Sequence, residues 1–139
     1  MLNVKRVYDP PARADGARFL VERLWPRGMK KEALTMKAWL KDVAPSDALR
    51  RWFAHDPAKW EEFRRRYFAE LKGREDALRP ILEASARGNV TLLYSAHDTG
   101  HNNALALKEY LDSLAARGTR APGARSKRAR STARGGKTA

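Results

Sequence analysis

The sequence predicts a single α/β domain: a small, mainly parallel sheet flanked by helices, followed by a disordered basic tail. Three observations support this. The β-branched and apolar run Val90–Tyr94 has the length of a buried strand, which we place near the centre of the sheet. After it, residues 104–114 repeat apolar side chains at helical spacing. A strand followed directly by such a helix is the unit from which α/β folds are built.

Charge divides the chain near residue 117. The 139 residues include 29 Lys and Arg against 16 Asp and Glu, a formal net charge of +13. Eight of the basic residues and none of the acidic ones fall in residues 117–139, which leaves residues 1–116 with only +5. The tail has no large apolar side chain to offset the entropy of ordering it. We therefore expect one folded domain at residues 1–116 and a disordered tail at 117–139.

Several classes of protein are excluded by composition. The chain has no cysteine, which excludes disulfides, thiolate metal ligands and a cysteine nucleophile. Its N-terminus lacks the apolar core of a signal peptide, and no run approaches the roughly eighteen apolar residues of a membrane span. We expect a cytoplasmic protein with no membrane partner.

The N-terminal third is expected to supply the other strands. Residues 2–8 and 19–25 are strand-like and are separated by Pro-Pro and Asp-Gly turn signals. Residues 34–40 fit either a strand or a helix, and we favour a strand. Gly88, just before the central strand, suits the left-handed position that closes a helix.

The middle of the chain is expected to be helical. Ser46 is the predicted N-cap of one helix, and Asp56, followed by Pro57, that of a second. A third helix at residues 75–86 contains Pro80, which predicts a kink or a restart. In the second helix, side chains four residues apart predict ion pairs, so its basic triplet is a solvated face rather than a nucleic-acid patch. The predicted pairs are Glu61 with Arg65 and Glu62 with Arg66.

Three separated blocks resemble a known family. They are VERLWPRGMKKEAL at 21–34, APSDALRRWFAHDPAKWEEFRRRYFAEL at 44–71 and VTLLYSAHDTGHNNALALKEYL at 90–111. Together they resemble the YeaO-like family of small bacterial proteins of unknown function, over about residues 2–114. The resemblance implies a compact α/β fold and no established reaction, substrate or cofactor. The family pattern often has Lys at the position of His97 and requires neither His55 nor His101.

The run LLYSAHDTGHNNA at residues 92–104 first suggests a metal site. His97 and His101 with Asp98, joined by His55 across space, are residue types that bind zinc, nickel or iron. Two histidines four apart share a face only within a continuous helix, whereas Asp98-Thr99-Gly100 has the chemistry of a helix start. We therefore predict no metal. Nor does the serine of this run lie in the G-x-S-x-G elbow of hydrolases.

The same run lies where α/β sheets bind ligands. Asp98 or Thr99 is expected to cap the following helix. The crevice beyond the carboxyl ends of parallel strands, together with an exposed helix N-terminus, favours an anion. Ser95 and Asn102 are the expected orienting groups, and His97 or Asp98 is the candidate catalytic proton carrier.

The block ERLWPRG is the second candidate. Pro26 and Gly28 predict a turn that projects Arg23 and Arg27 from the end of a strand. Arginine binds phosphate or carboxylate with a planar fork, and Trp25 offers a wall for a ring.

A structural interpretation of this block stays open beside the ligand interpretation. In it, Trp25 caps the core and Arg23 pairs with an acid such as Asp56 or Asp98. The ligand interpretation predicts binding, with or without transformation, of a small anionic or nucleotide-like molecule. The alternatives are a nucleic-acid-associated protein that binds non-specifically through residues 117–139, or a protein-interaction module. The sequence specifies no cofactor, no oligomeric state and no decision between enzyme and binding protein.

Overall fold

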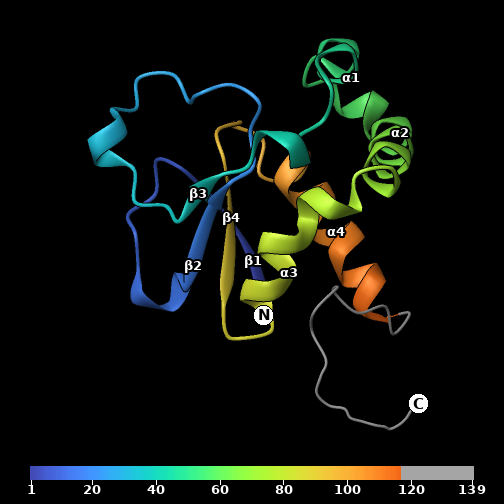
Figure 1. Ribbon diagram of the computed structural model, residues 1–139. Coiled ribbons are helices and arrows are strands. Elements are labelled where there is room, and N and C mark those ends of the chain that lie inside the picture. The colour runs from blue at the N-terminus through green and yellow to red at the C-terminus, as the bar shows by residue number, and fades with distance from the viewer. Residues whose placement is uncertain (117–139) are drawn as a thin grey trace, which may run out of the picture.

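A computed structural model describes residues 1–116, in which four strands form a parallel sheet packed against helices (Figure 1). The strands are β1 (Leu2–Arg6), β2 (Ala17–Leu20), β3 (Ala38–Trp39) and β4 (Val90–Tyr94). They lie in the order β1-β4-β2-β3, and each neighbouring pair is parallel. All five residues of β4 are buried, as its continuous apolar run predicted. The predicted α/β fold with a central Val90–Tyr94 strand is confirmed.

The helices of the described region follow the predicted order. The α-helices are α1 (Asp47–Phe53), α2 (Trp60–Lys72), α3 (Arg79–Ser85) and α4 (Asn103–Ala116). Short 3-10 helices are η1 (Arg13–Asp15), η2 (Lys31–Ala33), η3 (Lys41–Val43), η4 (Pro57–Lys59) and η5 (Glu75–Leu78). None of the helices within residues 1–116 is both long and apolar enough to cross a membrane.

The local start signals were predicted correctly. Ser46 Oγ accepts a hydrogen bond from the Leu49 N–H at 3.2 Å, and Asp56 Oδ1 accepts one from the Ala58 N–H at 3.0 Å. Pro80 lies in the first turn of α3, so the predicted third helix does restart there, after η5. Each signal acts within a few residues, where the sequence is a sufficient guide.

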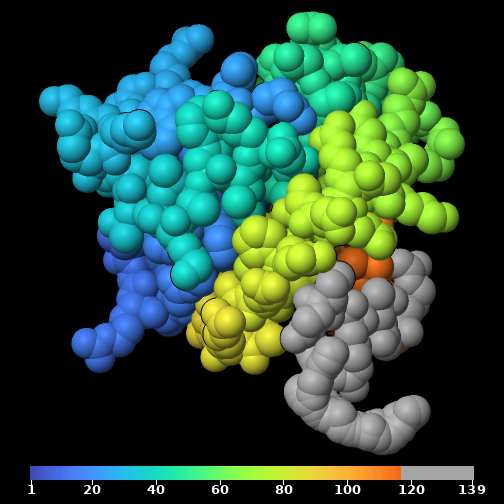
Figure 2. Space-filling model, in the orientation of Figure 1, coloured from blue at the N-terminus to red at the C-terminus, as the bar shows by residue number. Residues whose placement is uncertain are grey.

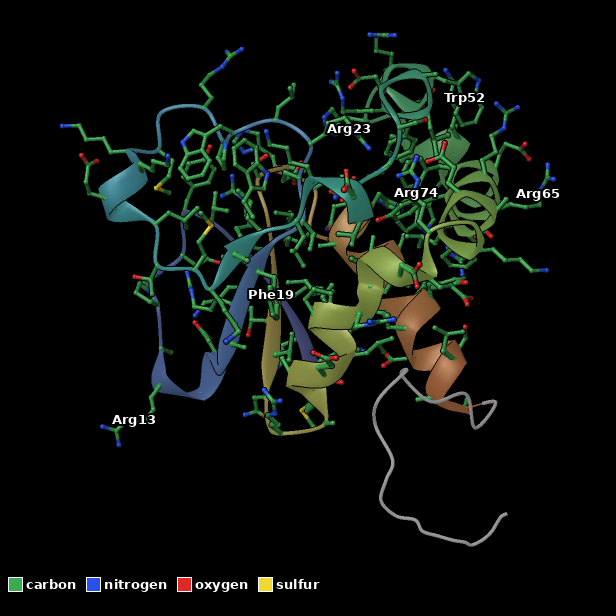
Figure 3. All side chains as sticks on the ribbon, viewed as in Figure 1. Arg13, Phe19, Arg23, Trp52, Arg65 and Arg74 are labelled. Atoms are coloured by element: carbon green, nitrogen blue, oxygen red, sulfur yellow. The ribbon has the colours of Figure 1, made fainter. Side chains whose placement is uncertain are left out.

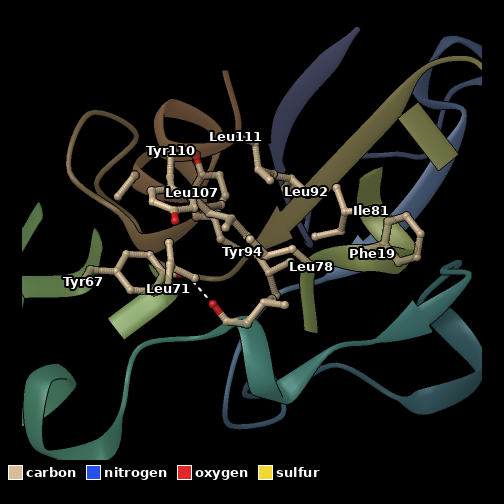
Figure 4. Close-up of a cluster of buried hydrophobic side chains, with 14 of the residues drawn as sticks. Phe19, Tyr67, Leu71, Leu78, Ile81, Leu92, Tyr94, Leu107, Tyr110 and Leu111 are labelled. Carbon is tan, nitrogen blue, oxygen red and sulfur yellow. Dashed lines mark hydrogen bonds between the residues drawn. The ribbon is translucent and has the colours of Figure 1, made fainter. Parts of the chain in front are cut away.

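The two faces of the sheet are covered differently. On one face, Phe19, Leu92 and Tyr94 pack against the α-helices and form the main core (Figure 4). Within that core the Tyr67 hydroxyl donates a hydrogen bond to the Val43 carbonyl. On the other face, Leu20 and its neighbours pack beneath the connecting segments rather than beneath an α-helix. That second cluster contains Val7, Leu34 and Leu93, with Trp25, Met29, Met36 and Trp39 partly buried against it.

Strand boundaries in the N-terminal third differ from the prediction. β2 spans Ala17–Leu20 rather than residues 19–25, and the favoured strand at 34–40 is reduced to the two residues of β3. The chain leaves the sheet after the Val21 N–H has bonded to the Leu93 carbonyl, 3.2 Å away, and turns into the ERLWPRG block. The length of β2 depends on its pairing with β4, which lies far away in the sequence. The two residues of β3 pair with β2.

Gly88 does not close a helix in the left-handed conformation. The glycines with positive φ in the described residues are Gly16 and Gly28. The N–H groups of Arg87 and Gly88 both bond to the Ala84 carbonyl, at 3.0 and 3.2 Å. This is a right-handed end to α3, so the expectation for Gly88 was wrong.

The basic triplet of α2 is paired with carboxylates. Arg66 bonds to Glu62 at 2.7 Å, as predicted, and Arg65 bonds to the same carboxylate. Glu61 pairs with Arg64, three residues on, instead of with Arg65. The predictions for residues 117–139 concern a segment outside the described residues.

Candidate functional site

A cavity of about 1050 Å³ lies at the carboxyl ends of β1, β4 and β2. Its wall is made by residues that follow these strands, by the turn at residues 24–27 and by α1 with the segments on either side of it. In Figure 2 the turn region and α1 form neighbouring lobes at one end of the molecule. Parallel strands end at one edge of a sheet, which is where open α/β sheets bind ligands. The volume is that of a large small-molecule site.

The seven residues predicted to bind or act on a ligand all line this one cavity. They are Arg23, Trp25, Arg27, Ser95, His97, Asp98 and Asn102. Two segments distant in the sequence meet here because β2 and β4 pair in parallel, with Leu20 opposite Leu93. The residues that follow each strand are therefore delivered to the same edge.

The two arginines of the ERLWPRG block differ in their contacts and exposure. Arg23 donates from Nε to the Pro45 carbonyl at 3.0 Å and from Nη2 to the Ala44 carbonyl at 3.3 Å. Backbone carbonyls thus hold it, rather than the acids that the structural alternative named. The side chain of Arg27 is exposed, while its carbonyl accepts a hydrogen bond from the Tyr8 hydroxyl at 2.8 Å.

Trp25 is both a core residue and a cavity wall. Its Nε1 donates to the Met29 carbonyl at 2.6 Å, and its ring meets Trp39 edge-on, with 5.3 Å between centroids. The Met29 N–H bonds to the Pro26 carbonyl at 3.4 Å, and Gly28 has a φ of 75°. This is the predicted turn, with glycine at the position that needs positive φ.

The loop between β4 and α4 is built differently from the prediction. Asp98 Oδ1 accepts the N–H groups of Gly100 and His101, at 2.9 and 3.1 Å, and so forms a separate turn before the helix. Asn102 is the residue that caps α4: its Oδ1 accepts the Leu105 N–H at 2.8 Å. The predicted cap at Asp98 or Thr99 was wrong, because the turn at Asp98 delays the start of the helix.

Asn102 has its polar atoms engaged within the protein. Besides the cap, its Nδ2 donates to the Asp98 carbonyl at 3.1 Å, and the residue is only 2% exposed. Asn102 therefore shapes the loop. Asn103 ties the same loop to the end of β2, because its Nδ2 donates to the Val21 carbonyl at 2.6 Å.

The acid and the histidines of this loop do not form a metal centre. Hydrogen bonds from the Gly100 N–H and then from His101 lower the pKa of Asp98 and keep it ionised. His101 Nδ1 lies 2.9 Å from Asp98 Oδ2, whereas His97 is exposed at the cavity wall. Nowhere in residues 1–116 do three or more His, Asp or Glu side chains gather closely enough to hold a metal ion.

Glu22 is a cavity residue that the sequence reasoning missed. Its Oε2 accepts the Ser95 N–H at 3.0 Å. Burial raises the pKa of Glu22 from 4.5 to about 7, against the opposing effects of the Ser95 hydrogen bond and the charge of Arg50. A desolvated carboxyl whose pKa is raised towards neutrality is typical of functional sites. The sequence feature that could have identified Glu22 is its position directly after the apolar run at the end of β2.

Two further arginines line the cavity. Arg6 donates from Nε to the Ala96 carbonyl at 2.9 Å and from Nη2 to the Ser95 carbonyl at 3.3 Å. Arg50 bonds to Asp47 at 3.3 Å through Nη2, but its Nε is buried without an acceptor in the described part of the chain. Neither arginine carries a sequence signal of its own, because each reaches the cavity only through the tertiary fold.

Comparison with known proteins gives the family. The model of the inactive DUF488-N3 subclade matches residues 1–129. The chain belongs to this subclade. It is 42% identical over 113 residues to the uncharacterised protein YeaO of Escherichia coli, a match that covers 81% of this chain and 98% of YeaO. The resemblance to the YeaO-like family is thereby confirmed.

Members of the family in mycobacteria are similar over the same extent. Uncharacterised proteins of Mycobacterium bovis and Mycobacterium tuberculosis are each 36% identical over 111 residues, covering 80% of this chain and 93% of the relative. No solved structure matches the chain. The matched length corresponds to the described domain, and the relatives carry no established function to transfer.

Proposed function

We propose that the protein binds a small anionic or nucleotide-like ligand in the cavity at the strand carboxyl ends. The charge of the cavity wall is the observation that carries this proposal. Four guanidinium groups line the wall, against two carboxyl groups. They are those of Arg6, Arg23, Arg27 and Arg50, and of Glu22 and Asp98. Even with both carboxyls ionised, the wall keeps an excess of positive charge, which favours phosphate or carboxylate.

In this proposal the arginines contact the anion in two different ways. Arg6 and Arg23 are held by backbone carbonyls, so little side-chain entropy is lost when they meet an anion. Arg27 is exposed at the rim and free to close over the ligand. Trp25 supplies a flat wall and Ser95 a hydroxyl, while Asn102 holds the loop that presents Ser95.

Binding is favoured over catalysis. Asp98 has a lowered pKa and is therefore a weak base, which weakens its predicted role as proton carrier. His97 lines the cavity but is exposed, and Glu22 is the better-placed acid–base group. The family description names the subclade as inactive, which agrees with a ligand-binding role.

Calorimetric titration of the full chain with inorganic phosphate, pyrophosphate, ribose 5-phosphate and nucleoside monophosphates tests the proposal. Arg27→Ala should weaken binding by about tenfold, the size of a lost charge-assisted hydrogen bond. Arg13→Ala is the matched control, because it removes the same charge from an exposed site far from Arg23 and the cavity (Figure 3). Equal affinity of Arg27→Ala and wild type would remove Arg27 from the site. Failure of every anion to bind the wild type would reject the function.

A further inference from the structure

Two groups inside the cavity offer hydrogen bonds that the protein does not use. The Ser95 N–H occupies Glu22 Oε2, and no hydrogen bond from residues 1–116 reaches Oε1. Arg50 Nε is buried and has no acceptor within the described residues. Buried polar groups are nearly always satisfied, because an unmade hydrogen bond costs the full desolvation of the group. Among the described residues Arg50 Nε is such a buried and unused donor, and Glu22 Oε1 is an accessible, unused acceptor in the same cavity. Together they offer a ligand one donor and one acceptor.

The wall of the cavity also changes in character from the protein core to the surface. Phe53 and Phe63 contribute to its wall from the core and are almost fully buried. Arg27 and Leu24 contribute from the exposed turn, where Leu24 is 57% exposed. The cavity therefore offers an apolar surface, the interacting charges of Glu22 and Arg50, and a cationic exposed turn. These three surfaces require different chemistry in different parts of a ligand.

We propose that the ligand is bifunctional: its anionic group lies among the outer arginines, and a planar ring with an N–H donor enters the inner part. Glu22 Oε1 accepts the ring N–H, and Arg50 Nε donates to a neighbouring acceptor of the ring. The inner carboxyl would repel a bare anion, whereas a ring N–H lowers the cost of keeping it buried. This inference rests on the proposed anion-binding function and specifies the ligand class as nucleotide-like rather than simple phosphate.

The surroundings of Glu22 agree with this role. The groups that face it are Arg50 from α1, the buried Tyr67 from α2 and the Ser95 N–H from the loop after β4. None of them occupies Oε1. With a pKa of about 7, the carboxyl is partly ionised at neutral pH and is an effective acceptor for an N–H group.

Glu22→Gln provides a sharp test, because it inverts one hydrogen bond. The Ser95 N–H requires an oxygen at the position of Oε2, so the Gln amide must place its NH₂ group at the position of Oε1. An acceptor becomes a donor with almost no change in shape. A ligand that donates to this position then meets a second donor.

The experiment compares inorganic phosphate, ribose 5-phosphate and the four nucleoside 5′-monophosphates on the full chain, by calorimetry. We expect at least one monophosphate to bind the wild type at least tenfold more tightly than ribose 5-phosphate. Glu22→Gln should remove that advantage while leaving phosphate within about threefold. Glu32→Gln, an exposed acid outside the cavity wall, should change neither affinity.

The outcomes separate the two proposals. If phosphate binds but no monophosphate exceeds ribose 5-phosphate, or if Glu22→Gln leaves the monophosphate unaffected, the bifunctional ligand is wrong and anion binding stands. If Glu22→Gln weakens phosphate and monophosphate equally, Glu22 acts only on the shape of the cavity, and the inference is also wrong. If no anion binds the wild type, the proposed function itself fails.

Discussion

At the scale of single residues, the cavity contains two carboxyl groups whose environments shift their pKa values in opposite directions. Asp98 receives hydrogen bonds from the Gly100 N–H and from His101, and its pKa is lowered. Glu22 is half-buried, receives one backbone hydrogen bond and has its pKa raised to about 7 by desolvation. Desolvation dominates where few donors compensate for it. Asp98, one of the two residues proposed from the sequence as proton carrier, is therefore less suited to that role than Glu22, which the sequence reasoning missed.

The raised pKa of Glu22 predicts a pH-dependent stability difference. A carboxyl whose pKa rises on folding stabilises the fold fully below its unfolded value of 4.5, and this contribution is lost as the pH rises through about 7. Glu22→Gln stays neutral, so its free energy of unfolding relative to wild type should increase between pH 5 and pH 8, by at most about 3 kcal/mol. Urea denaturation at the two pH values measures it. If the difference in free energy of unfolding between the variant and wild type does not change with pH, the raised pKa of Glu22 is contradicted.

At the scale of elements, short-range signals were predicted correctly and element ends were not. The caps at Ser46 and Asp56 depend on neighbours within three residues, and both form as predicted. The end of β2 depends on pairing with β4, and the cap of α4 on a turn at Asp98 that excludes the next residues from the helix. The sequence shows which residues are present, but it does not show which of them pair with one another.

The start of α4 gives a direct test of the observed cap. Asn102→Ala should destabilise the protein by about 1–2 kcal/mol, because the Leu105 N–H loses its acceptor at the helix N-terminus. Thr99→Ala removes an exposed side chain from the position that the sequence favoured and should cost less than about 0.5 kcal/mol. Chemical denaturation measures the free energy of unfolding of both variants. An equal loss in the two would mean that Asn102 is not the cap.

Two glycines provide a second test at this scale. A Cβ on Gly16 would lie 2.1 Å from the Asn89 carbonyl oxygen, and the residue has a φ of 65°. Gly16→Ala should therefore cost about 2 kcal/mol or more in the free energy of unfolding. Gly88 has open space around its Cβ position and no positive φ, so Gly88→Ala should be neutral or slightly stabilising. Comparable destabilisation by both, measured by thermal and urea unfolding, would refute this distinction.

At the scale of the whole molecule, most of the excess positive charge and the cavity belong to different parts of the chain. Eight of the 29 basic residues lie in residues 117–139, outside the described region, whereas the cavity is lined by residues of the described domain. Nucleic-acid binding through that segment stays a prediction. The proposed anion binding involves residues of the described domain, so the two proposed activities should be separable.

Deletion of residues 117–139 tests that separation. Non-specific binding to duplex DNA should be lost at moderate salt, since the deletion removes the acid-free basic segment that supplies most of the excess charge. Binding of small anions in the cavity should be unchanged. A gel-shift assay and a calorimetric titration of the same truncated protein measure both. DNA binding that survives deletion would show that the tail is not the binding element.

The sequence by itself determined the α/β class, the buried central strand, the caps at Ser46 and Asp56 and the turn at Gly28, because these depend on residues that are close in the chain. It also selected two segments whose side chains do meet in one cavity. Only the tertiary structure decided that Asn102 caps α4 and that Glu22 is the half-buried acid of the cavity. Burial and strand pairing decided these points, and both are set by contacts between segments far apart in the sequence.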